Sequence, residues 1–180
     1  MTSEKTTVKP KSQRAQVERT QAGRAHVGLG ERRSAARLAA VQALYQMDLT
    51  QKGLNEIIPE FERHWMGKEI EGEQYKPTDS ALFRIIVQGV IDHQKRIDPT
   101  VDDLLAKGWP LKRIETVMRA VLRAGAFELL QSPDVPVKVV ISEYVDIARA
   151  FFEKEETAMV NAVLDRLARE ARSGELPQKA

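Results

Sequence analysis

The apolar residues of the chain recur mainly at steps of three and four, the spacing that places them on one face of an α-helix. The most regular run, residues 114–129, keeps this spacing without a break and predicts a central helix. Residues 31–50 form a second run, whose charged start passes into an apolar stripe. Further helices are expected from about residue 54, over 79–97, over 139–152 and over 157–171.

Prolines and polar stretches mark the expected breaks between these helices. Pro59 lies inside the second one and predicts a kink or a late start there. Asp98 followed by Pro99 predicts a stop and a restart, with Asp98 as the N-cap of a short fourth helix. Residues 67–77 are polar and predict a loop, and residues 132–136 contain two prolines that predict a stiff linker.

One segment is compatible with either a strand or a helix. Residues 139–141 are all β-branched, which favours a strand. The helical spacing nevertheless continues from Val140 to Phe152, so we predict a helix. No strand pair or hairpin signal is found elsewhere. The sequence therefore predicts an all-α fold with about seven helices.

The charge is unevenly distributed along the chain. Residues 1–33 carry eight Lys or Arg and three acids, hence +5, whereas the other residues carry 20 and 23, hence −3. We expect a disordered basic tail at 1–30, a helical domain at 31–172 and a disordered tail at 173–180. A basic arm on a mildly acidic body indicates a polyanionic partner, although such tails often serve only solubility.

The composition excludes several classes of chemistry. The chain has no cysteine, which excludes disulfides and thiolate catalysis and fits a reducing compartment. No apolar run approaches the roughly 20 residues that span a bilayer, and the N-terminus lacks an apolar signal core, so we expect a cytoplasmic protein without membrane contact. His26, His64 and His93 lie too far apart in sequence to predict a metal site. No catalytic residues and no cofactor are predicted.

Nucleic-acid binding is favoured by clustered cations and one aromatic side chain. Arg32, Arg33 and Arg37 open the first long helix, and Arg33 and Arg37 share a face. Tyr45 follows on the same helix and could stack on a base. Arg119 and Arg123 could extend this surface if the central helix packs beside the first. The alternative is an amphipathic helix whose arginines are merely solvated.

Four segments together resemble the NusB family of bacterial transcription antitermination factors. They are AAVQALYQMDL (39–49), VLRAGAFELL (121–130), DVPVKVVISEYVDIARAFF (134–152) and MVNAVLDRLARE (159–170). The resemblance spans residues 32–169 and implies two small helical bundles packed into one domain. It also implies a non-enzymatic protein that binds boxA RNA of ribosomal leaders with NusE, a small-subunit ribosomal protein. NusA, NusG and RNA polymerase would complete the assembly that suppresses termination, and some relatives form homodimers.

The resemblance also carries individual residues. Arg33 and Arg37 match the arginine-rich start of the family's first helix, Tyr45 matches its tyrosine, and Arg123 matches the arginine of its central helix. The resemblance thus implies that these four contact RNA. Ser34 and Ala35 stand where the family can have arginine, and Arg32 and the basic tail could supply that charge. Met159 stands where relatives often have phenylalanine, and Met118 stands near a position that can be acidic and face NusE. The candidate RNA-binding residues are Arg32, Arg33, Arg37, Tyr45, Arg119, Arg123 and Met159.

Two other functions compete with this interpretation. NusB-like domains also occur attached to RNA methyltransferases, but this chain has neither the cysteine nor the spare length for that catalytic half. A purely structural helical scaffold would leave the arginines without an RNA ligand.

Overall fold

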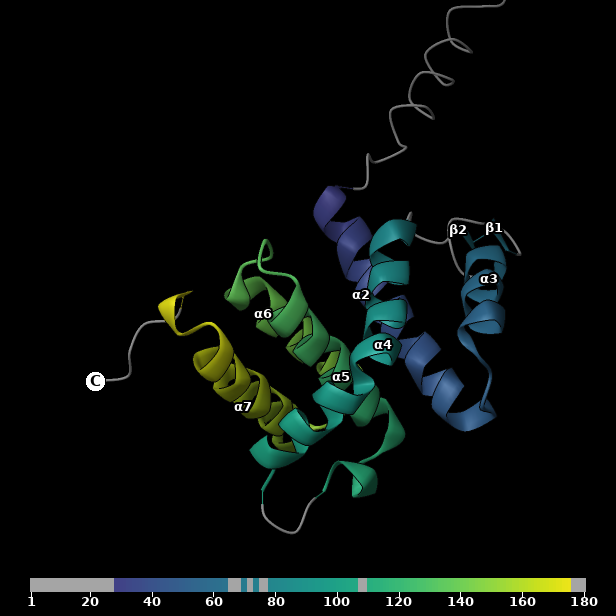
Figure 1. The fold of residues 1–180 in the computed structure, drawn as a ribbon. Coiled ribbons are helices and arrows are strands. Elements are labelled where there is room, and N and C mark those ends of the chain that lie inside the picture. The colour runs from purple at the N-terminus through teal and green to yellow at the C-terminus, as the bar shows by residue number, and fades with distance from the viewer. Residues whose placement is uncertain (1–27, 65–68, 71–72, 75–77, 107–109, 176–180) are drawn as a thin grey trace, which may run out of the picture.

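A computed structural model describes residues 28–64, 69–70, 73–74, 78–106 and 110–175, and its fold is shown in Figure 1. Within these ranges lie six α-helices: α2 (Leu29–Thr50), α3 (Leu54–His64), α4 (Ser80–Leu104), α5 (Thr116–Gln131), α6 (Val137–Arg149) and α7 (Lys154–Ala171). Two 3-10 turns, Leu111–Arg113 and Ser173–Glu175, add short helical pieces. The all-α prediction is confirmed. Among these helices, none combines the length and the apolarity needed to cross a membrane.

Helix α5 occupies the centre of the molecule, as its unbroken apolar spacing predicts. It packs against α2, α4, α6 and α7, which surround it in Figure 1. With neighbours on several sides, α5 has buried residues at every position from Ala120 to Leu129. Two of these, Arg123 and Glu128, are charged. A charge inside the core must be paired there, so α5 both builds the core and receives ion pairs from its neighbours.

The helices divide into two packed groups, which meet where α4 and α2 pack against α5. Helices α2, α3 and the first part of α4 form one group, in which the rings of Phe61 and Phe83 stack with centroids 5.7 Å apart. Helices α5, α6 and α7 form the other. Gly125 lets α5 approach its neighbours closely, because an added Cβ would lie only 3.0 Å from the methyl groups of Leu164. This arrangement agrees with the two small bundles expected from the resemblance.

The break expected at Asp98 and Pro99 is wrong, because α4 continues through both residues. Proline costs one backbone hydrogen bond, but the buried side chains of Ile97 and Val101 keep the apolar stripe continuous across it. The helix absorbs the proline by changing direction along its length, as Figure 1 shows. The Asp98 carboxylate binds Arg123 instead of capping a helix. The predicted third and fourth helices are therefore one element.

The segment between α3 and α4 also differs from its prediction. Residues 67–77 were expected to form only a loop, but Glu69–Ile70 and Glu73–Gln74 pair as antiparallel strands β1 and β2. Two-residue strands are too short to show a period of two in the sequence, so no signal marks them. Helix α3 begins at Leu54 and runs through Pro59, so the late start expected there is not observed.

The described residues extend slightly beyond 31–172 at each end. Gly28 caps α2, which begins at Leu29. After α7, the guanidinium of Arg172 donates to the backbone carbonyls of Pro133 at 3.0 Å and Val135 at 2.8 Å, and Glu175 pairs with it at 2.7 Å. Arg172 thus fastens the last 3-10 turn to the linker between α5 and α6. The remainder of both predicted tails lies outside the described residues.

Candidate nucleic-acid interface

The exposed cations of α2 lie in its first turns, beside the start of α4. Arg32 is exposed, and the Arg33 side chain is 51% accessible. The backbone N–H of Asp79 donates to the carbonyl of Arg32 at 3.1 Å, and the Asp79 carboxylate lies 3.9 Å from Nε of Arg33. The two arginines therefore project from the start of α2, which this hydrogen bond joins to the start of α4. The positive end of the α2 dipole adds to their field.

Arg37 lies on the same helix, but its side chain is buried rather than on the surface where an RNA ligand is expected. Its side chain is 3% exposed and forms a two-point contact with Glu128, with N–O distances of 2.7 and 2.9 Å. Glu143 lies 3.6 Å away as a second carboxylate. Burial alone would lower the pKa of Arg37, but the hydrogen bond and charge of Glu128 outweigh it and raise that pKa. Arg37 therefore joins α2 to α5 inside the core.

Tyr144 completes this buried cluster from α6. Its hydroxyl donates to Glu128 at 2.8 Å, so one carboxylate receives both Arg37 and Tyr144. Burial, and then the charge of Glu128, raise the pKa of Tyr144 well above its ordinary value of 10.0. The phenol consequently stays protonated and remains a donor at any physiological pH. Nothing in the local sequence marks this cluster, because its members come from three helices.

Arg119 and Arg123 form a second cluster at the other end of α2. Arg123 donates to both oxygens of Asp98, at 2.7 and 2.8 Å, and also lies 3.1 Å from Asp48. Arg119 pairs with Asp48 at 3.1 Å. Burial lowers the pKa of Arg123, but Asp98 and then Asp48 outweigh it and raise that pKa. The central helix does pack beside the first, which was the condition for a shared surface, but the packing pairs these arginines with acids.

The distance along α2 separates this second cluster from the exposed arginines. Asp48 follows Arg33 by 15 residues, which corresponds to about 22 Å of helix. The single cationic surface expected to combine Arg33, Arg37 and Arg123 is therefore not assembled. Tyr45 is half-buried against the core, about 18 Å of helix from Arg33. Of the predicted cations, Arg32 and Arg33 are the ones that present free charge to solvent at this end.

Met159 lines an apolar groove rather than a cationic surface. The groove has a volume of about 490 Å³, and its floor includes Met118, Met159, Ile114 and Phe152. Its rim carries three carboxylates, Glu115, Glu155 and Glu156, against one cation, Arg113. Acidic side chains repel phosphate, so this charge pattern favours a basic or apolar ligand.

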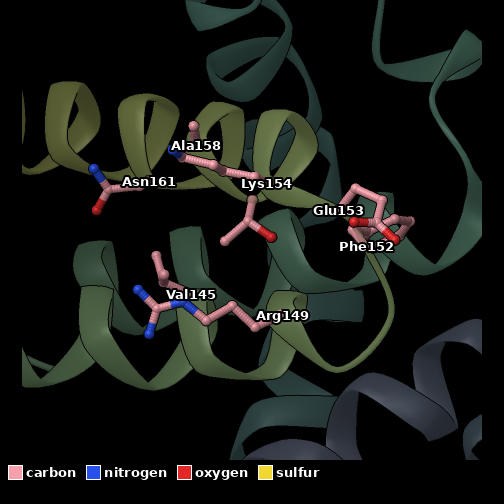
Figure 2. Close-up of a pocket in the computed structure, with 8 residues that line it drawn as sticks. Val145, Arg149, Phe152, Glu153, Lys154, Ala158 and Asn161 are labelled. Atoms are coloured by element: carbon pink, nitrogen blue, oxygen red, sulfur yellow. The ribbon is translucent and has the colours of Figure 1, made fainter.

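A further groove follows the seam between α6 and α7, shown in Figure 2. Val145 and Arg149 come from α6, and Ala158 and Asn161 come from α7. The cavity has a volume of about 460 Å³ and carries charges of both signs, with Arg149 held by Asp146 at 2.6 Å. This mixed lining indicates no particular ligand. Among the described residues, no group of three or more acidic, histidine or cysteine side chains is arranged to hold a metal ion.

Sequence reasoning missed two carboxylates that contact the start of α2. Glu143 lies 2.9 Å from the Ser34 hydroxyl as well as beside Arg37. Asp79 caps α4 and also lies beside Arg33, a position that the sequence does not predict. Ser34 and Glu143 are 109 residues apart, and a single sequence gives no signal for a contact at that separation.

The described residues form a helical body that pairs its internal charges and presents exposed cations at one helix end, which is the arrangement of a protein that binds an anionic partner. The model of the NusB family matches residues 34–169. The chain belongs to the NusB family, a family of transcription antitermination proteins.

Relatives and solved structures agree with this assignment. The NusB protein of Bradyrhizobium sp. strain BTAi1 is 60% identical over 156 residues, covering 87% of this chain and 92% of that relative. NusB of Rhodopseudomonas palustris strain HaA2 is 61% identical over 144 residues, covering 80% and 85%. The structure of T. maritima NusB has a TM-score of 0.66 at 29% identity, covering 79% and 94%. A crystal structure of NusB and NusE with dsRNA shares the fold, with a TM-score of 0.63 at 22% identity over 76% and 96%.

Proposed function

We propose that this protein binds the boxA element of nascent ribosomal RNA leaders together with NusE and thereby suppresses premature termination. Membership of the family supports the antitermination role, and a solved relative holds both NusE and RNA. The observation that carries the RNA-binding part is the exposed pair Arg32 and Arg33 at the start of α2. The larger assembly with NusA, NusG and RNA polymerase, and self-association, are proposed from the family resemblance alone.

The phosphate contacts are assigned to the first turns of α2. Arg33 pairs with Asp79 only at 3.9 Å and is half exposed, so an RNA phosphate can take that guanidinium at small cost. Arg37 would have to leave the buried carboxylate of Glu128, and Arg123 would have to leave two partly exposed carboxylates, Asp48 and Asp98. Each exchange costs more than the one at Arg33. We therefore assign Arg32 and Arg33 to RNA, and Arg37 and Arg123 to holding α2 in place.

The groove around Met118 and Met159 is assigned to NusE. Its apolar floor offers a contact for aliphatic or aromatic side chains, and its three rim glutamates favour a basic partner. Ribosomal proteins bind RNA and are commonly basic, which makes their charge complementary to this rim. Met159 then contacts the protein partner rather than an RNA phosphate.

The RNA assignment is tested by titrating labelled boxA RNA at several salt concentrations, with and without NusE. Arg33→Ala should weaken binding by roughly three- to tenfold and reduce the slope of log K against log salt by about 0.7, the value for one phosphate of a single strand. Arg166→Ala is the matched control, because Arg166 is similarly exposed on α7. Equal losses in both variants would contradict a specific role for Arg33.

The NusE assignment is tested by adding charge to the groove. Met159→Lys should weaken NusE binding at least tenfold, because a buried ammonium in an apolar floor would be desolvated on docking. Ala158→Lys adds the same charge at the neighbouring exposed position of α7 and should leave NusE binding nearly unchanged. RNA binding without NusE should not fall in either variant. A loss of RNA binding in Met159→Lys but not in Ala158→Lys would indicate that Met159 contacts RNA.

A further inference from the structure

The Asp79 carboxylate performs two separate functions with its two oxygens. Oδ1 accepts the backbone N–H of Leu82 at 3.0 Å and so caps α4. Oδ2 faces Nε of Arg33 at 3.9 Å, beyond hydrogen-bonding distance. Because the cap restrains the carboxylate, the remaining gap can be closed only by movement of the flexible Arg33 side chain. The geometry therefore holds a negative charge beside Arg33 without saturating its donors.

The position of Arg33 relative to Asp79 is itself fixed. The backbone N–H of Asp79 donates to the carbonyl of Arg32 at 3.1 Å, which ties the start of α4 to the first turns of α2. Ser34, the next residue, lies 2.9 Å from Glu143 of α6. A phosphate bound to Arg33 therefore lies in the field of the Asp79 carboxylate, which is 22% exposed and 3.9 Å from Nε of that arginine.

We propose that Asp79 sets the affinity of the RNA-binding surface by competing with RNA phosphate for the Arg33 guanidinium. The inference rests on the proposed function, because it requires RNA to contact Arg33. Binding exchanges one weak ion pair for another, and the displaced carboxylate stays nearby and repels the phosphate. Asp79 thus lowers the phosphate-dependent attraction, which is independent of RNA sequence.

Asp79→Asn separates the charge from the cap, because asparagine caps a helix as well as aspartate does. We expect this variant to unfold at the wild-type temperature and to bind RNA roughly three- to tenfold more tightly at low salt. The gain should be equal for boxA RNA and a scrambled RNA of the same length, and it should shrink as salt is raised. Asp79→Ser also keeps a cap without the charge and guards against a misfolded variant.

Two controls assign the gain to its cause. Asp103→Asn removes the same charge from an exposed site at the other end of α4 and should change RNA affinity little. In the Arg33→Ala background, Asp79→Asn should give no comparable gain, because the group for which it competes is absent. A full gain in that background, or a gain limited to boxA RNA, would overturn the proposal.

The outcomes also distinguish the inference from the function on which it rests. A wild-type protein that fails to bind either RNA, with or without NusE, would refute the proposed function. The wild-type protein could instead bind boxA RNA with the expected salt dependence and as tightly as Asp79→Asn and Asp79→Ser do. That result would refute only the role of Asp79.

Discussion

At the scale of single residues, the environment of an arginine decides its role more than its place in a pattern. Arg33 and Arg37 are four positions apart on one helix, yet their side chains are 51% and 3% exposed. The period of the helix correctly placed both on one face. It could not show that Glu128 would meet Arg37 there, because the two residues are 91 positions apart. A cation that reaches a buried carboxylate becomes part of the core.

Arg37→Ala should destabilise the fold rather than specifically weaken RNA binding. Removing one partner of a buried pair leaves Glu128 as an uncompensated charge, at a cost of about 3–5 kcal/mol. Urea unfolding measures the loss. The double variant Arg37→Met with Glu128→Leu removes both charges and should recover much of the stability. An Arg37→Ala protein with wild-type stability and weak RNA binding would contradict this account.

Tyr144 should make the free energy of unfolding depend on pH in the alkaline range. Its pKa is raised in the fold, so the folded state holds the phenol proton after an unfolded chain would release it near pH 10. Stability from this group is thus complete below pH 10 and falls as the pH rises further, by up to about 1.4 kcal/mol per pH unit. Tyr144→Phe should remove this contribution to the slope in unfolding experiments from pH 9 to 11.

At the scale of elements, the apolar spacing identified each long helix among the described residues but misplaced one boundary. Asp98 and Pro99 form a good local start signal, and only the tertiary packing of Ile97 and Val101 overrides it. For residues 139–152 the same spacing correctly favoured a helix over a strand. The spacing of apolar residues shows which face of a helix is buried, and the folded protein keeps that face buried. A capping signal shows only a local preference, which tertiary packing can outweigh.

The contact between α4 and α5 depends on Gly89. A Cβ at this position would overlap the ring of Phe127, which is buried and lies 5.9 Å from the His93 ring. Gly89→Ala should therefore destabilise the protein by about 1–3 kcal/mol in thermal or urea unfolding, despite the better helix propensity of alanine. Gly30→Ala is the matched control in α2, where a Cβ meets nothing within 4 Å. That change should leave the stability nearly unchanged or raise it slightly, because Gly30 lies in the first turn of the helix.

At the scale of the whole molecule, α2 and α5 run in opposite directions and are fixed at both ends by ion pairs. Arg37 near the start of α2 meets Glu128 near the end of α5, whereas Asp48 near the end of α2 meets Arg119 near the start of α5. The exposed arginines and the Met159 groove consequently lie toward opposite ends of α5. The sequence alone supplied the helices, but the direction in which they pack determines which charges remain free.

Arg123 joins three helices and should act through stability. Arg123→Ala leaves the carboxylates of Asp48 and Asp98 without their shared cation. We expect a loss of about 1–3 kcal/mol in urea unfolding, discounted for the partial exposure of both acids. RNA affinity of the folded variant should stay within about twofold of the wild type. A large loss of RNA affinity at unchanged stability would reassign Arg123 to the RNA surface.

The contact of Arg172 with the carbonyls of Pro133 and Val135 gives the last turn of the chain a mechanical role. These hydrogen bonds hold the linker between α5 and α6 in place. A chain cut after Ala171 would lose these hydrogen bonds, although no core residue would have been removed. The linker would then become a preferred site of proteolysis. Affinity tags and fluorophores are accordingly better attached beyond Glu175 than in place of the residues that precede it.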